Sequence, residues 1–206
     1  MSLTFFFAPM STASTVHWSL EELGIPYEAV EVDLKDPADK QKKLGPINPN
    51  LKVPVLVHDG TVVFESAAIQ IYLGETFGVD KGLFPAPGRE RGEALKWLVW
   101  ANVSLGEAVG RWQRNAGDYS PADQRNAAAG AAARKDLDQL IGIFEQELGG
   151  KSHVLGKQIS LVDFHLASFF QWMGFLGVDL TSYPKTKAWF ERCTARPALA
   201  KLRGAS

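Results

Sequence analysis

The sequence predicts an α/β domain followed by an all-helical domain. In residues 1–78, short apolar runs typical of strands alternate with segments of helical periodicity. After residue 89, turn signals become rare and long stretches carry apolar residues at helical spacing. Between them, residues 79–88 are rich in glycine and proline, which is typical of a linker. We therefore expect two domains, 1–78 and 89–206, joined by the linker 79–88.

Apolar periodicity and turn residues predict the order βαβαββα for the first domain. Pro9 ends the first apolar run, and Gly24 followed by Pro26 ends the first helix. The dipeptide Asp59-Gly60 between two short apolar runs predicts a tight hairpin. A helix between the first two strands makes them parallel, whereas the hairpin strands are antiparallel. The expected elements are strands at 3–8, 27–32, 54–57 and 61–64, and helices at 13–23, 36–45 and 66–77.

The second domain is expected to contain only helices. The third of them has the clearest start, because Ser160 stands three residues before Asp163 in the pattern of a capping box. We therefore interpret Asp163 as a folding element and exclude it from catalysis. The expected helices cover residues 89–115, 121–148, 183–193 and 197–202, together with the one that begins at Ser160.

Composition excludes several classes of function. The 206 residues carry a net charge of −1, which gives no reason to expect a nucleic-acid partner. That balance divides at the linker, with five basic and eleven acidic residues in 1–80, a net of −6, and +5 in 81–206. Cys193 is the only cysteine, so the chain cannot form an intrachain disulfide or a cysteine-rich metal site. We expect no metal, no membrane segment and a cytoplasmic location.

Four sequence motifs in this order resemble the cytosolic-type glutathione S-transferase family over essentially the whole chain. They are the turn after the first strand at 7–13, the Asn-Pro segment at 48–56, the Glu-Ser segment at 64–69, and the capping segment at 159–163. Each is weak alone, whereas their order and spacing together are specific. The resemblance implies a thioredoxin-like first domain that binds glutathione and a helical second domain that binds an electrophile.

The first motif and the residue that follows it hold three hydroxyl groups, on Ser11, Thr12 and Ser14. A helix N-terminus favours an anion in front of it, and the resemblance implies that this anion is the thiolate of glutathione. A hydroxyl there would lower the pKa of the thiol through a hydrogen bond. We rank Ser11 first, Thr12 second and Ser14 third. The competing interpretation is that a given hydroxyl merely caps the helix.

The second and third motifs are expected to bind the rest of glutathione. The resemblance implies a cis Val53-Pro54 bond whose preceding backbone pairs with the cysteinyl part like an added strand. Glu65 would meet the γ-glutamyl ammonium and Ser66 its carboxylate. Alternatively, Pro54 only begins a strand and Ser66 is only a helix cap. For the glycyl carboxylate, Lys52 is the better candidate and Lys43 the weaker one.

The electrophile pocket is expected to include Met10 and Trp112, whose soft and aromatic side chains suit apolar molecules. The resemblance implies a homodimer and a detoxification enzyme that transfers the glutathione thiolate to an apolar electrophile. Two alternatives remain: a glutathione-dependent disulfide reductase or peroxidase, and a non-catalytic binding protein of this fold. The absence of a cysteine from the first turn argues against mixed-disulfide chemistry at the protein.

Overall fold

The computed structural model describes residues 2–116 and 119–202, which form two compact units. The first unit holds the described part of 1–91 together with 197–202, and the second holds the described part of 92–196. The last helix thus belongs to the compact unit formed by the N-terminal part of the chain. The expected division at 78, 88 and 206 stays a prediction.

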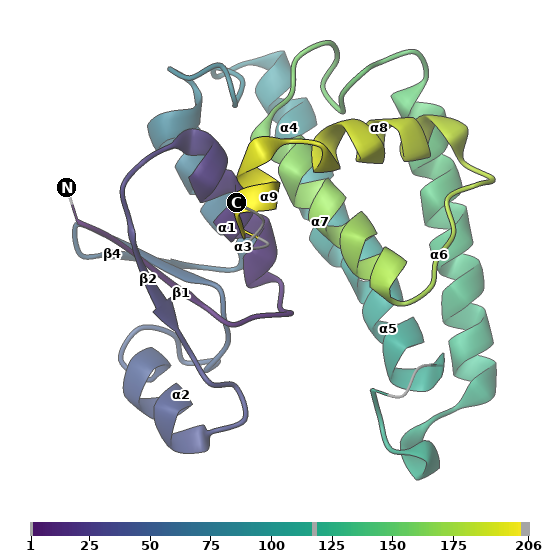
Figure 1. The fold of residues 1–206 in the computed structure, drawn as a ribbon, viewed down its shortest axis with the longest axis horizontal. Coiled ribbons are helices and arrows are strands. Elements are labelled where there is room, and N and C mark those ends of the chain that lie inside the picture. Colours follow the sequence, from purple (N-terminus) through teal and green to yellow (C-terminus); the bar gives the residue numbers. More distant parts are fainter. Residues whose placement is uncertain (1, 117–118, 203–206) are drawn as a thin grey trace. The chain divides into compact units, whose positions relative to one another are not determined.

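The first unit is built on one four-stranded mixed sheet (Figure 1). The strand order is β2-β1-β3-β4, with β1 parallel to β2 and the other neighbours antiparallel. This confirms the predicted element order and strand directions. The strands are β1 (Leu3–Phe7), β2 (Glu28–Glu31), β3 (Val55–His58) and β4 (Thr61–Phe64).

The strand register brings three separate parts of the chain to one edge of the sheet. Phe6, near the end of β1, pairs with Val55 at the start of β3. Val55 in turn pairs with Phe64 at the end of β4. The segments that follow β1, precede β3 and follow β4 therefore leave the sheet at the same end.

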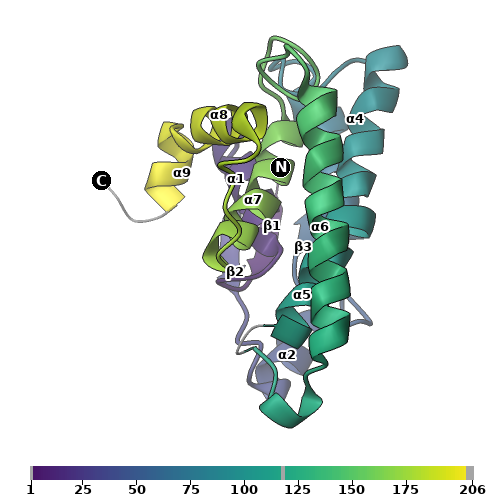
Figure 2. The same ribbon diagram turned by 90° about the vertical axis from the view of Figure 1, so that its right-hand side faces the viewer.

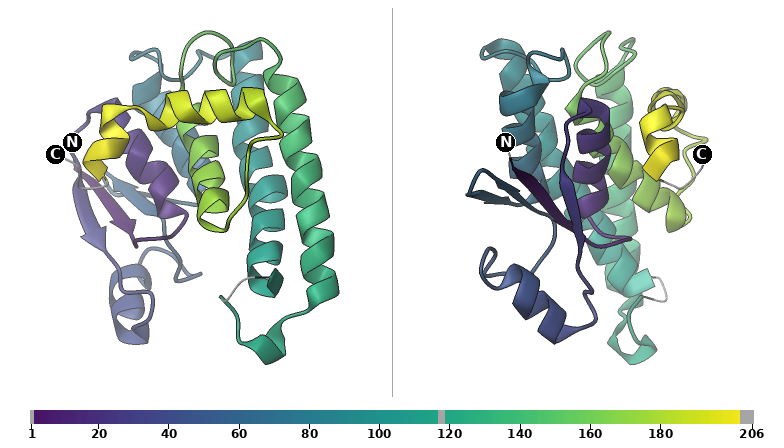
Figure 3. Two further views of the ribbon diagram at one scale, coloured as in Figure 1. Left: turned by 45° about the vertical axis from the view of Figure 1, so that its right-hand side comes forward. Right: turned by 60° about the vertical axis from the view of Figure 1, so that its left-hand side comes forward.

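The helices of the first unit pack on both faces of its sheet (Figure 3). The helices α1 (Ala13–Leu23) and α3 (Ser66–Leu73) contact each other, and α9 (Pro197–Leu202) contacts α1. The fully buried Phe5 faces α1, where its ring packs against His17. Phe6 points to the opposite face and packs in a cluster with Leu44 of α2 (Pro37–Leu44).

The helix expected at 66–77 is only partly α-helical. After Leu73 the chain forms a π-helical turn at Gly74–Gly78, with Val79 N–H donating to Gly74 O. A Cβ at Gly74 would lie 2.5 Å from the ring of Phe84, so the close approach of this ring requires glycine. The ring of Phe84 therefore accounts for glycine at position 74, whereas the apolar periodicity of 66–77 gave no signal for the change from α-helix to π-helix.

The regular elements of the second unit are all helices over its described residues, as predicted, and its only β-pairing there is an isolated bridge between His153 and Gly156. The helices α5 and α6 lie side by side (Figure 2), and α8 contacts both α6 and α7. Between α4 and α5 a π-helical turn at Ala101–Gly106 interrupts the helix that was expected to be continuous. The helices are α4 (Arg89–Trp100), which begins in the first unit, α5 (Glu107–Ala116), α6 (Ala127–Leu148), α7 (Leu161–Phe175) and α8 (Pro184–Thr194).

The helix expected from Pro121 begins later, at Ala127. Asn126 caps it by accepting a hydrogen bond from Ala129 N at 3.0 Å, and residues Ala122–Gln124 form a short 3₁₀ turn instead. The structure therefore differs from the prediction, since Pro121 precedes a 3₁₀ turn and α6 begins six residues later. In contrast, α7 begins where predicted, with Ser160 and Asp163 forming the expected capping box.

Asp163 is fully buried and belongs to the framework of the second unit. Its carboxylate accepts hydrogen bonds from Val154 N, from Ser160 N and Oγ, and from Trp189 Nε1, at 2.8–2.9 Å. Burial raises the pKa of the Asp163 carboxyl, and these hydrogen bonds oppose that rise. All its described partners are structural, in agreement with its predicted role in folding. Among the described residues, no helix is long and apolar enough to cross a membrane.

Candidate active site

Three non-glycine residues with positive φ stand beside the segments that meet at the end of the sheet. They are Met10 with φ 55°, Leu51 with φ 50° and Glu65 with φ 71°. Such conformations cost about 1–3 kcal/mol each and gather at functional sites. The backbone itself therefore marks this edge of the sheet as a candidate site.

Ser11 and Ser14 use their hydroxyl protons inside the first turn. Ser11 Oγ donates to Ala8 O at 2.7 Å and accepts from Ala13 N at 3.2 Å. Ser14 Oγ donates to Ser11 O at 3.0 Å. Both side chains therefore stabilise the turn, and a hydrogen bond from either to a ligand would replace an existing one.

Thr12 differs from both serines. It is exposed at the start of α1, and only its carbonyl has partners, Thr15 N at 3.3 Å and Thr15 Oγ1 at 2.9 Å. Neither its backbone N–H nor its hydroxyl donates a hydrogen bond to another described residue. An 11-residue helix follows, whose N-terminus carries a partial positive charge. Thr12 thus presents two donors where an anion is favoured.

The second segment reaches β3 through a cis Val53–Pro54 bond, as expected. The backbone N–H and C=O of Val53 form no hydrogen bond with the rest of the described chain. Asn48, which is 3% exposed, holds the loop, because its Nδ2 donates to Lys52 O at 2.8 Å and its Oδ1 accepts from Asn50 N at 3.0 Å. Sequence reasoning did not single out Asn48, although the run Asn-Pro-Asn is a turn signal.

The two candidate lysines are placed differently. Lys52 is exposed beside Val53. The ammonium of Lys43 donates to Glu31 O at 2.7 Å and to Asp39 Oδ2 at 2.9 Å. Lys43 therefore already has two acceptors within the fold, whereas the side chain of Lys52 is exposed next to the second segment.

The third segment is the start of α3. Glu65 is exposed, and Ile69 N donates to its carbonyl at 2.9 Å, which closes the first helical turn. Ser66 follows as the first residue of α3 and is 3% exposed. The arrangement leaves the Glu65 carboxylate in solvent beside a helix N-terminus.

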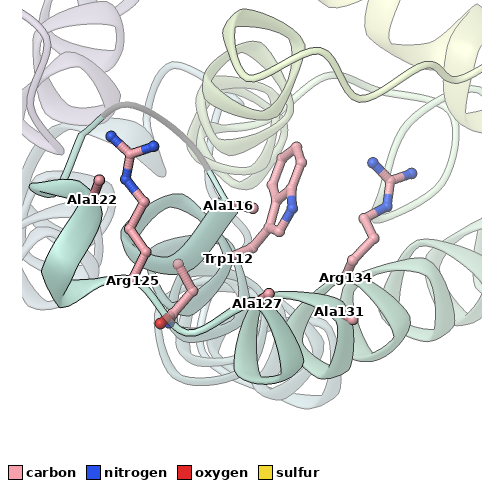
Figure 4. Close-up of a pocket in the computed structure, with 9 residues that line it drawn as sticks. Trp112, Ala116, Ala122, Arg125, Ala127, Ala131 and Arg134 are labelled. Atoms are coloured by element: carbon pink, nitrogen blue, oxygen red, sulfur yellow. The ribbon is translucent and has the colours of Figure 1, made fainter.

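Trp112 lies in the second unit, on the wall of a cavity of about 540 Å³ (Figure 4). Residues of α5, α6 and the 3₁₀ turn line the cavity, and five of them are alanine or glycine: Ala116, Ala122, Ala127, Gly130 and Ala131. The Arg134 guanidinium lies over the indole ring, 5.3 Å from its centroid. Met10 is 84% exposed in the first unit. The two residues are thus described in different units, and their expected shared pocket stays a prediction.

A cluster of titratable side chains lies along α1. His17 packs against Phe7 and Tyr27, and burial lowers the pKa of His17 although Glu21 opposes this. Glu21 accepts hydrogen bonds from the Tyr27 hydroxyl and from Lys201 Nζ of α9, both at 2.6 Å. Burial and the Glu21 carboxylate raise the pKa of the Tyr27 hydroxyl. These groups hold α1 in place and pair with one another.

Comparison with known proteins places both halves of the chain in one family. Residues 9–76 match the family model for the glutathione S-transferase N-terminal domain, and residues 116–197 match the model for the C-terminal domain. A solved glutathione transferase from Methylococcus capsulatus is 26% identical, with a TM-score of 0.85 and 98% of each chain covered. A sphingomonad glutathione S-transferase complexed with glutathione is 28% identical, with a TM-score of 0.83, covering 98% of this chain and all of that one.

Among curated proteins, glutathione S-transferase GstB of Escherichia coli K12 is 31% identical over 186 residues, which is 89% of this chain and 88% of GstB. The disulfide-bond oxidoreductase YfcG of the same strain is 28% identical over 200 residues, which is 94% of this chain and 90% of YfcG. The fold likewise consists of a thioredoxin-like unit and a helical unit. This chain belongs to the glutathione S-transferase family.

Proposed function

We propose that this protein is a glutathione transferase that binds glutathione at the edge of its sheet and activates its thiol. The observation that carries the proposal is Thr12, whose N–H and hydroxyl are both available at the N-terminus of α1. Two donors aimed at one anion favour the thiolate over the thiol and lower the pKa of the thiol. We assign Thr12 as the readier donor and Ser11 as the second, because Ser11 must first release Ala8 O.

The remaining parts of glutathione are assigned to the other two segments. The backbone N–H and C=O of Val53, next to Pro54, would pair with the cysteinyl residue as a strand does. The Lys52 ammonium would bind the glycyl carboxylate, and the Glu65 carboxylate the γ-glutamyl ammonium. The start of α3 at Ser66 would receive the γ-glutamyl carboxylate.

The reaction that follows from this arrangement needs no cysteine of the protein. The bound thiol releases its proton to solvent, and the sulfur lone pair forms a bond to an electrophilic carbon. The electron pair of the broken bond leaves with the displaced group, or is protonated by solvent when the electrophile is an activated alkene. The protein stabilises the thiolate and holds it near its target.

The electrophile is expected to be apolar and to contact Met10 and Trp112. Met10 offers a flexible thioether and Trp112 a flat ring, both suited to an apolar surface. We also propose a homodimer and a role in cytoplasmic detoxification, by analogy with the family. Replacing Trp112 by leucine should weaken binding of an aromatic electrophile and leave the affinity for glutathione unchanged.

A second candidate function is glutathione-dependent disulfide reduction. The similarity to the disulfide-bond oxidoreductase YfcG favours it. In that reaction the glutathione thiolate attacks a sulfur of the substrate disulfide and a second glutathione releases the product, so two glutathione molecules are oxidised to one disulfide. Mass spectrometry of the products distinguishes the two reactions, since transfer gives a thioether and reduction gives glutathione disulfide.

The experiment that tests the proposed function is a pH titration of glutathione bound to the wild-type protein, followed by the ultraviolet absorbance of the thiolate. We expect the pKa of the bound thiol to lie below that of free glutathione. A bound thiol that titrates like the free one would overturn the proposal. S-methylglutathione, which has no titrating thiol, provides the background.

A further inference from the structure

Gln70 of α3 makes a direct hydrogen bond to the backbone of α1. Its side chain is fully buried, and its Nε2 donates to Thr15 O at 2.8 Å. Its Oε1 is also buried and has no hydrogen-bond partner among the described residues. A long polar side chain that uses one of its two polar ends in the protein interior is unusual.

The bond joins the N-terminal halves of α1 and α3, the two helices that carry the candidate site. Gln70 stands one turn after Ser66 in α3, and Thr15 of α1 lies four residues after Ser11, which precedes that helix. Thr15 is also hydrogen-bonded to Thr12, the candidate hydrogen-bond donor to the thiolate, because Thr15 Oγ1 donates to Thr12 O at 2.9 Å. A displacement of α3 relative to α1 would therefore strain the Gln70–Thr15 hydrogen bond. Thr15 is in turn hydrogen-bonded to Thr12.

We propose that Gln70 is a positioning residue, which holds the thiol-activating turn of α1 in register with the glutathione-binding start of α3. This inference rests on the proposed function. Glutathione would be anchored at Ser66 and activated at Thr12, so both turns must keep a fixed separation. Since misplacement of reacting groups by about 1 Å costs up to about a hundredfold in rate, a single buried bond has a large effect there.

The unpartnered Oε1 of Gln70 allows the positioning role to be distinguished from a contribution to stability. A buried carbonyl without a partner destabilises the folded state, and an apolar side chain of similar length avoids that penalty. Gln70→Met loses the bond to Thr15 O, which still accepts from Ser19 Oγ, and also removes the unpartnered oxygen, so we expect a melting temperature close to that of the wild type. A loss of function without a loss of stability would identify positioning as the role of the amide.

Ser19 provides a matched control. Its Oγ donates to the same acceptor, Thr15 O, at 3.2 Å, and it is also fully buried. Because Ser19 belongs to α1, Ser19→Ala removes a hydrogen bond from that acceptor without loosening the link between the helices. The two variants thus differ in whether the lost bond crosses from α3 to α1.

The test compares wild type, Gln70→Met and Ser19→Ala by ultraviolet titration of bound glutathione and by calorimetry with S-methylglutathione. For Gln70→Met we expect the pKa of the bound thiol to rise by about one unit, as for loss of one hydrogen bond to a charged group. The dissociation constant of S-methylglutathione should change by less than threefold. Ser19→Ala should leave the thiol pKa at its wild-type value.

The possible outcomes distinguish a wrong assignment of Gln70 from a wrong proposed function. If the wild type lowers the thiol pKa and Gln70→Met keeps it lowered, the assignment of Gln70 is wrong and the proposed function stands. An equal rise in Ser19→Ala also overturns the assignment. If the wild type itself does not lower the thiol pKa, the proposed function and the assignment fail together. Gln70→Leu, a second apolar variant, replaces Gln70→Met should that protein not fold.

Discussion

The hydroxyl groups of the first turn should contribute unequally to thiol activation, and Thr12→Val against Ser11→Ala tests this. A hydrogen bond to a charged group contributes about 1.5–3 kcal/mol, which corresponds to about 1–2 units of pKa. The Thr12 hydroxyl gives up no described partner when it donates to the thiolate, so its removal should raise the thiol pKa by this amount. Its exposure favours the lower end of the range.

Ser11 should have a smaller effect on the thiol and a larger one on stability. Its proton already binds Ala8 O at 2.7 Å, and that bond, worth about 0.5–1.5 kcal/mol, must be broken first. We therefore expect Ser11→Ala to raise the thiol pKa by less than about one unit and to lower unfolding free energy by about 1 kcal/mol through loss of the turn. Ultraviolet titration and thermal unfolding measure the two quantities. A larger pKa rise in Ser11→Ala than in Thr12→Val would refute this reasoning.

Three further predictions concern binding, stability and pH. Lys52→Ala should weaken glutathione binding about two- to fivefold, and by less at high salt. Lys43→Ala should leave glutathione binding unchanged, because the Lys43 ammonium is already bound to Glu31 O and Asp39. Calorimetry measures both affinities, and equal losses would contradict the assignment of Lys52. Asp163→Ala should lower the unfolding free energy by about 2–4 kcal/mol in urea titrations, since it leaves buried donors without an acceptor; an unchanged midpoint would speak against the capping role. Burial lowers the pKa of His165 to about 3, below its value of about 6.5 in the unfolded chain. The unfolded state therefore binds the proton first as the pH falls. The unfolding free energy should decrease below about pH 6.5, by up to about 1.4 kcal/mol per pH unit. His165→Gln should flatten this slope between about pH 4 and 6, and a slope as steep as that of the wild type would exclude His165 as its source.

Local signals predicted most of the fold because the relevant interactions are close in sequence. The two residues of the hairpin turn, Asp59 and Gly60, have φ values of 45° and 85°. Such a turn depends on these two residue types alone, so the sequence indicates it directly. The capping box at Ser160 is equally local. The π-helical turn at Gly74–Gly78 was not predicted, since apolar residues recur at nearly the same spacing in α- and π-helical turns. Asn126 was missed because Pro121 also begins a short helical turn.

For the candidate site, the sequence indicates which hydroxyl-bearing residues lie in the first turn, but not which of their protons are free to bind a ligand. Three neighbouring hydroxyls are visible in the sequence, but their order of availability depends on whether a backbone carbonyl accepts each proton. Ala8 O accepts that of Ser11, and no described residue accepts that of Thr12. Gln70 lies 55 positions from its partner Thr15, so no local pattern indicates the link. Contacts between distant segments therefore carry the information that a single sequence lacks.

The positive φ of Met10 restricts which residues this position can hold. Its backbone is held in the left-handed region just before the hydroxyl-rich turn of the candidate site, while its side chain is 84% exposed. The conformation restricts which residues are tolerated there, and asparagine and glycine adopt it most readily. Under the proposed function, a change of electrophile preference at this position would require glycine, asparagine or another small polar residue, because the main chain disfavours β-branched residues there.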